Sequence, residues 1–274
     1  MKRINNSWLW IFCFCLLSII ACKEKTDGCL DVEATNFDVS ADEPCPDDCC
    51  EYPMLSLEIA HRIDTLIFAY GTAYDLGEQT GRILKIKFYL SDVRLTNDAE
   101  TLEVLERIDL TPFIGDVINR KDDFALISRD NAAFTYTLGE TRQQGTFDTL
   151  RFSVGVDEQV NLTDPTTLTE GHPLGIQSDS LWSPERAYIF NKIIMVPDTM
   201  APMDTIEYNI TGDPNLVEIS IPYEKTVRLG VDVTIPLKID YQKWFTGIDF
   251  VADSPELVME KIVTNLANSF SINE

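Results

Sequence analysis

The chain has 274 residues, of which 45 are acidic and 22 are basic, so its net charge at neutral pH is −23. A surface this acidic repels the phosphate backbone, which argues strongly against nucleic acid as a partner. Only His61 and His172 supply imidazole, and this scarcity argues against most histidine-based catalysis.

The first segment of the chain is typical of an export signal. Two basic residues precede an uncharged apolar run of fourteen residues, 8–21, which is shorter than the ~20 residues that a membrane-spanning helix needs. The run ends in the sequence IIAC at 19–22, which resembles the lipobox of bacterial lipoproteins. We therefore expect residues 1–21 to be removed and Cys22 to carry lipid. The alternative is a plain signal peptide that happens to be followed by a cysteine.

Lipidation at this position predicts where the mature protein lies. Removal of residues 1–21 takes away two basic residues and no acidic ones, so the mature chain has a net charge of −25. Lipid chains would anchor it to a membrane leaflet without any spanning segment. The residue after the lipobox is Lys23 and not the aspartate that commonly retains such proteins at the inner membrane. We expect a protein of the cell envelope, held at the outer membrane.

The remaining cysteines predict disulfides close to the anchor. Cys29, Cys45, Cys49 and Cys50 fall within 22 residues, and no cysteine follows them. An exported chain with an even number of cysteines favours two disulfides, for which three pairings exist. Because a bond between adjacent cysteines is strained, Cys49 and Cys50 should each pair back to Cys29 or Cys45. Zinc is the competing interpretation, but no histidine lies nearby.

Residues 22–53 are predicted to form a small acidic module of their own. The segment 28–53 resembles a short cysteine module of exported Gram-negative proteins, with the pattern G-C-x-D-x-x-A-x-N-aromatic and a closing C-x-Y. A module of this size needs disulfides in place of a hydrophobic core. Asp31, Asn36 and Asp38 carry the oxygen ligands that Ca²⁺ prefers, although EF-hand spacing is absent. The alternative is a solvated acidic spacer.

The main domain, residues 54–274, shows the alternation of β-strands. Leu84, Ile86, Phe88 and Leu90 should share one face of a strand over 82–95. Further alternating or extended segments lie at 150–156, 187–196, 206–210, 217–221 and 227–235. A C-terminal helix is predicted from Ser254 and Pro255, with apolar residues every fourth position at 258, 262, 266 and 270. The pattern predicts an all-β fold: an antiparallel β-sandwich with a few short helices and a C-terminal helix.

Five blocks of this domain lie at 81–95, at 150–157 with a continuation to 174, at 181–190, at 227–245 and at 265–270. In this order they resemble the MbnP-like family of exported proteins. The resemblance covers residues 54–274 and implies the β-sandwich predicted above. In copper-binding members of the family, the metal lies among histidines and kynurenine, an oxidised tryptophan made by a partner dihaem peroxidase-like protein.

This chain departs from the copper-binding pattern at the metal site. Trp182 stands in the family's tryptophan loop, but the following residues, 183–186, contain neither a second tryptophan nor a histidine. The later strand that often carries a histidine, 206–213, has none. Because Cu(II) favours nitrogen ligands, the histidine-based site is predicted to be absent. Trp182 is then expected to pack against the sandwich, the alternative being that it is oxidised and ligates copper.

A methionine-rich segment offers a second candidate copper site. Met195, Met200 and Met203 lie close together, and thioethers select Cu(I). The alternative is that these methionines fill a gap under a loop. His61 lies in an alternating segment and is expected to be a satisfied strand histidine, whereas His172 falls in a loop between Gly171 and Pro173.

The sequence therefore predicts a non-enzymatic, membrane-anchored lipoprotein with a binding role. By resemblance, its ligand is copper and its partner a dihaem protein. The alternative is a surface adhesion protein, or a glycan- or protein-binding protein, that has lost the metal site.

Overall fold

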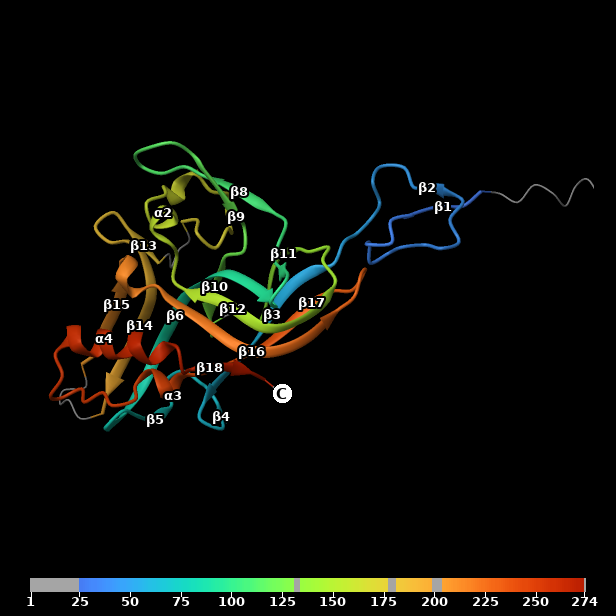
Figure 1. Cartoon of the computed structure of the whole chain (residues 1–274). Coiled ribbons are helices and arrows are strands. Elements are labelled where there is room, and N and C mark those ends of the chain that lie inside the picture. The colour runs from blue at the N-terminus through green and yellow to red at the C-terminus, as the bar shows by residue number, and fades with distance from the viewer. Residues whose placement is uncertain (1–24, 131–133, 177–180, 199–203, 274) are drawn as a thin grey trace, which may run out of the picture.

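Two β-sheets pack face to face, and a small module stands at one end of them (Figure 1). The computed structural model describes residues 25–130, 134–176, 181–198 and 204–273. The predicted lipidation site Cys22 and the methionines Met200 and Met203 lie outside these residues. The architecture is the predicted all-β sandwich with short helices.

The first sheet is built around β6 (Gln79–Thr96), whose length lets it pair with several strands at once. All pairs in this sheet are antiparallel. The other strands are β5 (Ala73–Leu76), β7 (Thr101–Leu102), β10 (Ala125–Ser128), β12 (Gly145–Val154), β13 (Trp182–Ser183), β14 (Ala187–Pro197), β15 (Ile206–Thr211) and β16 (Val217–Val227).

The second sheet is built around β3 (Met54–Ile63). Its other strands are β4 (Leu66–Ile67), β11 (Thr135–Glu140), β17 (Val233–Asp240) and β18 (Phe270–Ile272). The central pair, β3 and β17, is parallel, which departs from the predicted antiparallel arrangement. Such a pair needs a long crossover, and here the strands of the first sheet lie between the two in the chain.

The main core lies between the two sheets because alternate side chains of each strand point inward. Ile235, Leu237 and Ile239 of β17 are buried, while the residues between them are not. The same alternation in the first sheet buries Leu150, Phe152 and Val154 of β12. Periodicity predicted the buried face of β12 correctly, whereas in β17 it predicted Val233 and Ile235 but not Leu237 or Ile239.

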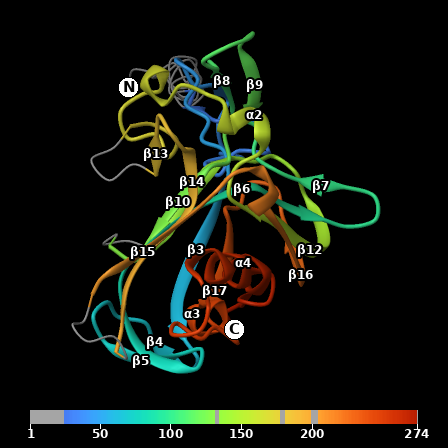
Figure 2. The same cartoon turned by 90° about the vertical axis from the view of Figure 1, so that its left-hand side faces the viewer.

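Two helices close one end of the core (Figure 2). They are α3 (Tyr241–Trp244) and α4 (Pro255–Leu266). The side chain of Ser254 accepts a hydrogen bond from the backbone N–H of Leu257, as the predicted cap requires. The buried face of α4 is the predicted one, but the helix ends at Leu266. Phe270 therefore belongs to β18 and not to the helix.

Two further predictions of strand register are wrong. Leu84 is 41% exposed, and its neighbour Ile83 is buried instead, because the pairing with β14 shifts between Met195 and Ile194 and reverses the alternation. The alternating segment 227–235 is not one strand, since β16 ends at Val227 and β17 begins at Val233. Gly230, with a φ of 67°, supports the turn between them.

The other end of the sandwich is covered by loops and short elements (Figure 2). A hairpin of β8 (Arg107–Leu110) and β9 (Ile118–Lys121) lies there with α2 (Glu158–Asn161) and two 3₁₀ turns, Pro165–Thr167 and Asp213–Asn215. They enclose a second, smaller core that includes Tyr89, Leu174 and Tyr188. This loop-covered end carries the predicted tryptophan loop.

The N-terminal module consists of turns around a parallel pair, β1 (Asp27–Gly28) and β2 (Glu43–Pro44). Disulfides join Cys29 to Cys50 and Cys45 to Cys49, so the prediction that each of the adjacent cysteines pairs back is confirmed. Figure 1 shows the module extending beyond the sandwich, to which the chain leads directly at β3. No helix of the described segments has the length and apolarity to cross a membrane.

Candidate functional site at the tryptophan loop

Trp182 lies in β13 at the loop-covered end of the sandwich, opposite Tyr188 of β14. Its indole stacks on Phe113, with the ring centroids 5.8 Å apart and the planes 23° from parallel. Phe113 is 57% exposed, so one face of the indole is covered by a ring that itself faces solvent. The indole Nε1–H is buried and has no acceptor among the described residues. Trp182 therefore packs onto the surface of the second core.

A buried polar network holds the strand opposite Trp182 in place. The hydroxyl of Tyr188 donates to the carbonyl of Leu174 at 2.8 Å, and its backbone N–H donates to the Asn161 side-chain oxygen at 3.1 Å. The Asn161 Nδ2 in turn donates to Asp213 at 3.1 Å. Burial raises the pKa of Tyr188 to about 12, so its hydroxyl keeps the proton that it donates. The loops around Trp182 are therefore tied to the sheet.

His172 lies at the same end, but both of its ring nitrogens are engaged. Nδ1 accepts a hydrogen bond from the backbone N–H of Leu174 at 3.1 Å, and Nε2 lies 2.9 Å from Oδ1 of Asp122. An acceptor at Nδ1 requires the proton of the neutral ring to be on Nε2, which donates it to the carboxylate. The ring thus ties its loop together and offers no nitrogen to a metal.

His61 lies in β3 and belongs to the main core, away from His172. Its Nδ1 is 2.6 Å from the hydroxyl of Tyr241, and the ring meets Phe134 edge-on. Nε2 is buried and has no hydrogen-bond partner among the described residues. The prediction of a strand histidine with satisfied hydrogen bonds therefore holds for one ring nitrogen only. Burial, together with the nearby charge of Arg129, lowers the pKa of His61 to about 4. The ring is therefore neutral at physiological pH.

The structure does not bring the two histidines together, and of the predicted copper ligands it describes only Met195 and Trp182. His61 contacts Tyr241 and Phe134 of the main core, whereas His172 packs against Phe124 of the second core. Met195 is fully buried in the main core, where it fills space between the sheets. In the parts of the chain that the structure describes, no group of three or more His, Cys, Asp or Glu side chains could hold a metal ion. A histidine-based copper site does not fit these residues.

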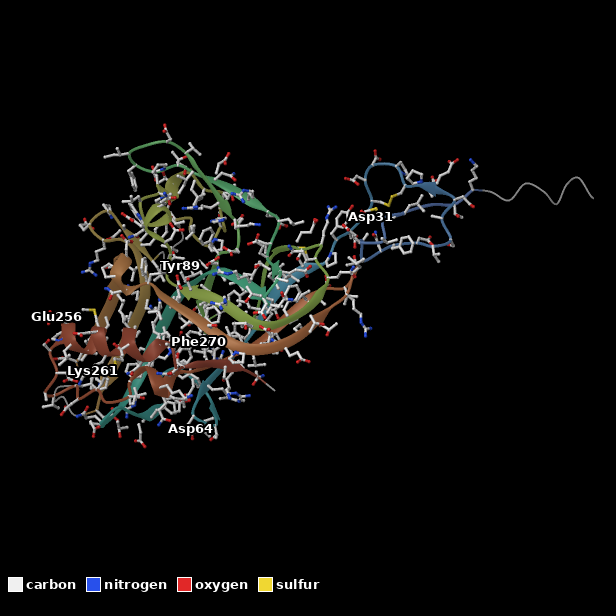
Figure 3. All side chains as sticks on the ribbon, in the orientation of Figure 1. Asp31, Asp64, Tyr89, Glu256, Lys261 and Phe270 are labelled. Atoms are coloured by element: carbon white, nitrogen blue, oxygen red, sulfur yellow. A yellow bond between two sulfur atoms is a disulfide. The ribbon has the colours of Figure 1, made fainter. Side chains whose placement is uncertain are left out.

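The predicted calcium ligands make hydrogen bonds that hold the turns of the cysteine module, in which Figure 3 labels Asp31. Asp31 accepts hydrogen bonds from the N–H of Glu33 at 3.0 Å and from the hydroxyl of Tyr52 at 2.9 Å, and these two bonds lower the pKa of the carboxyl group. Asn36 bridges the backbone of Cys49 and Glu51. Asp38 accepts from the backbone and hydroxyl of Ser40. These contacts leave the calcium prediction untested.

The module is also docked to the sandwich, which the sequence did not reveal. The guanidinium carbon of Arg142 lies 3.4 Å from the centre of the Tyr52 ring, a cation–π contact. Gly230 lies so close to Ala34 that a Cβ would come within 2.7 Å of its carbonyl oxygen. The module therefore packs on the connection between β11 and β12 and on the β16–β17 turn.

Comparison with known proteins places this domain. The model of the MbnP family matches residues 52–260. The chain belongs to the MbnP family. Among solved structures, it is similar to MbnP from Methylosinus trichosporium, at 16% identity and a TM-score of 0.44, over 72% of this chain and 78% of that one. A search of curated proteins finds no significant match.

Sequence reasoning missed two residues of the tryptophan loop's surroundings. Phe113, which covers the indole, precedes Trp182 by 69 positions, and Asn161 carries the polar network. The available signal for Phe113 was an aromatic residue in the connection between two short strands. No sequence signal pairs it with Trp182, because the contact depends on how the hairpin folds over the sheet.

Proposed function

We propose that this protein is an exported, lipid-anchored binding protein of the MbnP family and not an enzyme. Family membership supports a binding domain of this type. One structural observation carries the proposal: both histidines are engaged or buried inside the domain, so neither is placed as a general base or as part of an imidazole metal site. The ligand must therefore be recognised by other groups.

The proposed metal ligand is Cu(I), taken up by thioethers. Met200 and Met203 form an M-x-x-M pair, and soft sulfur selects Cu(I) over Cu(II). Trp182 would be the substrate of a dihaem peroxidase-like partner, as the resemblance to the copper-binding members implies. The indole stacks on Phe113 and lies opposite Tyr188, whose hydroxyl is hydrogen-bonded, and this supports the role because it gives the partner a fixed target.

Competition with a Cu(I) chelator tests the copper proposal. The full chain with both disulfides intact should compete for Cu(I), and replacing Met200 and Met203 together by leucine should abolish competition. Replacing Met259 of α4, which packs at the edge of the main core, by leucine is the matched control and should change nothing. Tight Cu(II) binding that His61→Ala removes would refute the proposal.

Mass spectrometry of the Trp182 peptide tests the partner. The residue should remain tryptophan in the protein expressed alone and become kynurenine when a dihaem peroxidase-like protein is co-expressed. Failure to compete for Cu(I), together with an unmodified Trp182 under both conditions, would favour the alternative of an adhesion or glycan- or protein-binding lipoprotein.

Membrane anchoring is tested separately at the lipobox. Cys22→Ala should move the protein from the outer-membrane fraction to the soluble fraction and should abolish labelling with palmitate. Continued labelling of the variant would show that lipid is attached elsewhere or that the signal has been misread.

A further inference from the structure

Two adjoining cavities lie on the outer face of the first sheet, beside the β8–β9 hairpin. Their volumes are about 420 and 130 Å³, and they share Asp92, Ser153 and Glu218 in their walls. Ser153 of β12 is paired with Ser91 of β6 on one side and with Glu218 of β16 on the other, so these polar residues form a row across three strands. The larger volume is within the range of small-ligand sites. We call the combined hollow the arginine trough.

Positively charged side chains lie opposite one another on neighbouring strands around this trough. Arg94 of β6 lies directly opposite Arg151 of β12, and both line the smaller cavity. Arg107 of β8 lies directly opposite Lys121 of β9, and both line the larger one together with Arg120. Like charges directly opposite one another destabilise a sheet. Two such pairs are unexpected in a chain whose acidic residues outnumber its basic ones by 45 to 22.

Two of these arginines are not neutralised by the protein. The guanidinium of Arg107 donates to the side chain and the backbone carbonyl of Asn119, and Nε of Arg151 lies 3.3 Å from the hydroxyl of Thr96. In the described part of the chain, neither arginine has a carboxylate partner. Both side chains are exposed. Each is therefore available to an anionic group of a ligand.

The carboxylates of the trough are mostly occupied and do not cancel these charges. Asp92 pairs with Arg94, and Asp157 accepts hydrogen bonds from the first N–H groups of α2. Asp123 is buried and accepts a hydrogen bond from the N–H of Val93. Burial raises the pKa of Asp123 to about 7, so a large part of it is uncharged at neutral pH. Glu218 is left in the row with Ser153, where both can bind hydroxyl groups.

We propose that the arginine trough binds an acidic saccharide, whose carboxylates meet Arg107 and Arg151 and whose hydroxyls meet Ser153 and Glu218. Arginine recognises a carboxylate through two parallel hydrogen bonds, which gives direction as well as charge. The serine and carboxylate row supplies the donors and acceptors that an inorganic anion would not use. The arginine trough shares no residue with the tryptophan loop or the methionine segment, so saccharide binding there does not depend on copper.

Calorimetric titration of the purified full chain at about 0.15 M ionic strength, where remote charges are screened, tests the proposal. The probes are trigalacturonate and trimannuronate, with galactotriose as a neutral trisaccharide and pyrophosphate as an anion without hydroxyls. At least one uronate should bind, more tightly than galactotriose and pyrophosphate. Arg107→Gln and Arg151→Gln should each weaken this binding about tenfold, since each removes charge-assisted hydrogen bonds.

Arg62→Gln is the matched control, because it removes the same charge from β3 in the other sheet. It should change the uronate affinity by less than about twofold, the small effect expected of a remote charge in screening salt. All three variants should keep the thermal unfolding midpoint and near-ultraviolet spectrum of the parent. The proposal is overturned if neither uronate binds, if pyrophosphate binds more tightly than both, or if Arg62→Gln weakens binding as much as Arg151→Gln.

Discussion

Asp123 gives the sharpest test of the electrostatics of this fold. The residue follows β9, is only 5% exposed, and accepts a hydrogen bond from the backbone N–H of Val93 at 2.9 Å. Burial raises the pKa of its carboxyl group from 3.8 to about 7, and the charge of Asp92 adds to this, while backbone N–H groups oppose it. The charged residues that line the same cavity are Asp92, Arg107, Arg120, Lys121, Asp157 and Glu218.

The raised pKa makes stability depend on pH in a definite direction. Between about pH 4 and pH 7 the folded protein holds a proton on Asp123 that the unfolded chain has released, so the free energy of unfolding falls as the pH rises. At about 1.4 kcal/mol per pKa unit, the full interval is worth about 4 kcal/mol. Asp123→Asn keeps an acceptor for the N–H of Val93 but cannot ionise. The difference in free energy of unfolding, variant minus parent, should therefore rise by about 2 kcal/mol between pH 5.5 and pH 8.

Urea unfolding followed by tryptophan fluorescence at pH 5.5, 7 and 8 measures this difference in unfolding free energy, which is called the gap below. Comparing variant with parent at each pH cancels the titration of all other groups that behave alike in both. Asp98→Asn, at an exposed loop position, is the control and should give a gap that does not change with pH. A constant or narrowing gap for Asp123→Asn would show that the buried carboxyl group is not protonated in the folded state.

Three further predictions concern packing and the module. Because only Ile83 is buried, Ile83→Ala should cost about 2–5 kcal/mol of unfolding free energy by urea titration, and Leu84→Ala less than about 1 kcal/mol. The reverse order would mean that the shift in register is absent. Gly155→Ala should cost at least about 2 kcal/mol of unfolding free energy, because the φ of Gly155 is 112° and a Cβ would lie 2.6 Å from an aromatic ring carbon of the second core. An unchanged thermal midpoint would refute this close approach. Replacing both cysteines of the Cys29–Cys50 disulfide by serine should make the module sensitive to protease, while the sandwich keeps its thermal unfolding midpoint. A large fall in that midpoint would mean that the module and the sandwich unfold together.

The features that the sequence predicted are those with local causes. Alternation in β12 follows from the geometry of a single strand, whichever strands lie beside it. The start of α4 follows from Ser254 and Pro255, which act within one turn. The pairing of Cys49 and Cys50 to earlier cysteines follows from strain between neighbours.

The features that escaped prediction depend on partners far away in the chain. Leu84 faces outward because the pairing of β6 with β14 shifts at that point, and β14 begins about a hundred residues later. The end of β16 is set in part by Gly230, which turns the chain where the module's Ala34 approaches. Alternation across 227–235 is real in the sequence, yet a glycine with positive φ interrupts the strand that it indicates.

The arginine trough shows how this limit extends to candidate sites. Arg94 and Arg151 are 57 positions apart, and nothing near either one distinguishes it from other surface cations. They face each other only because β6 carries a bulge opposite Phe152, at which Asp92 adopts a φ of 56°. Without the extra residue, the alternation of β6 beyond Asp92 would be reversed and Arg94 would point to the opposite face. The same bulge turns the side chain of Val93 toward the core and lets the N–H of Val93 donate to Asp123. It also lets Asp92 pair with Arg94. One strained residue, Asp92, therefore connects both cavities to the buried carboxyl group.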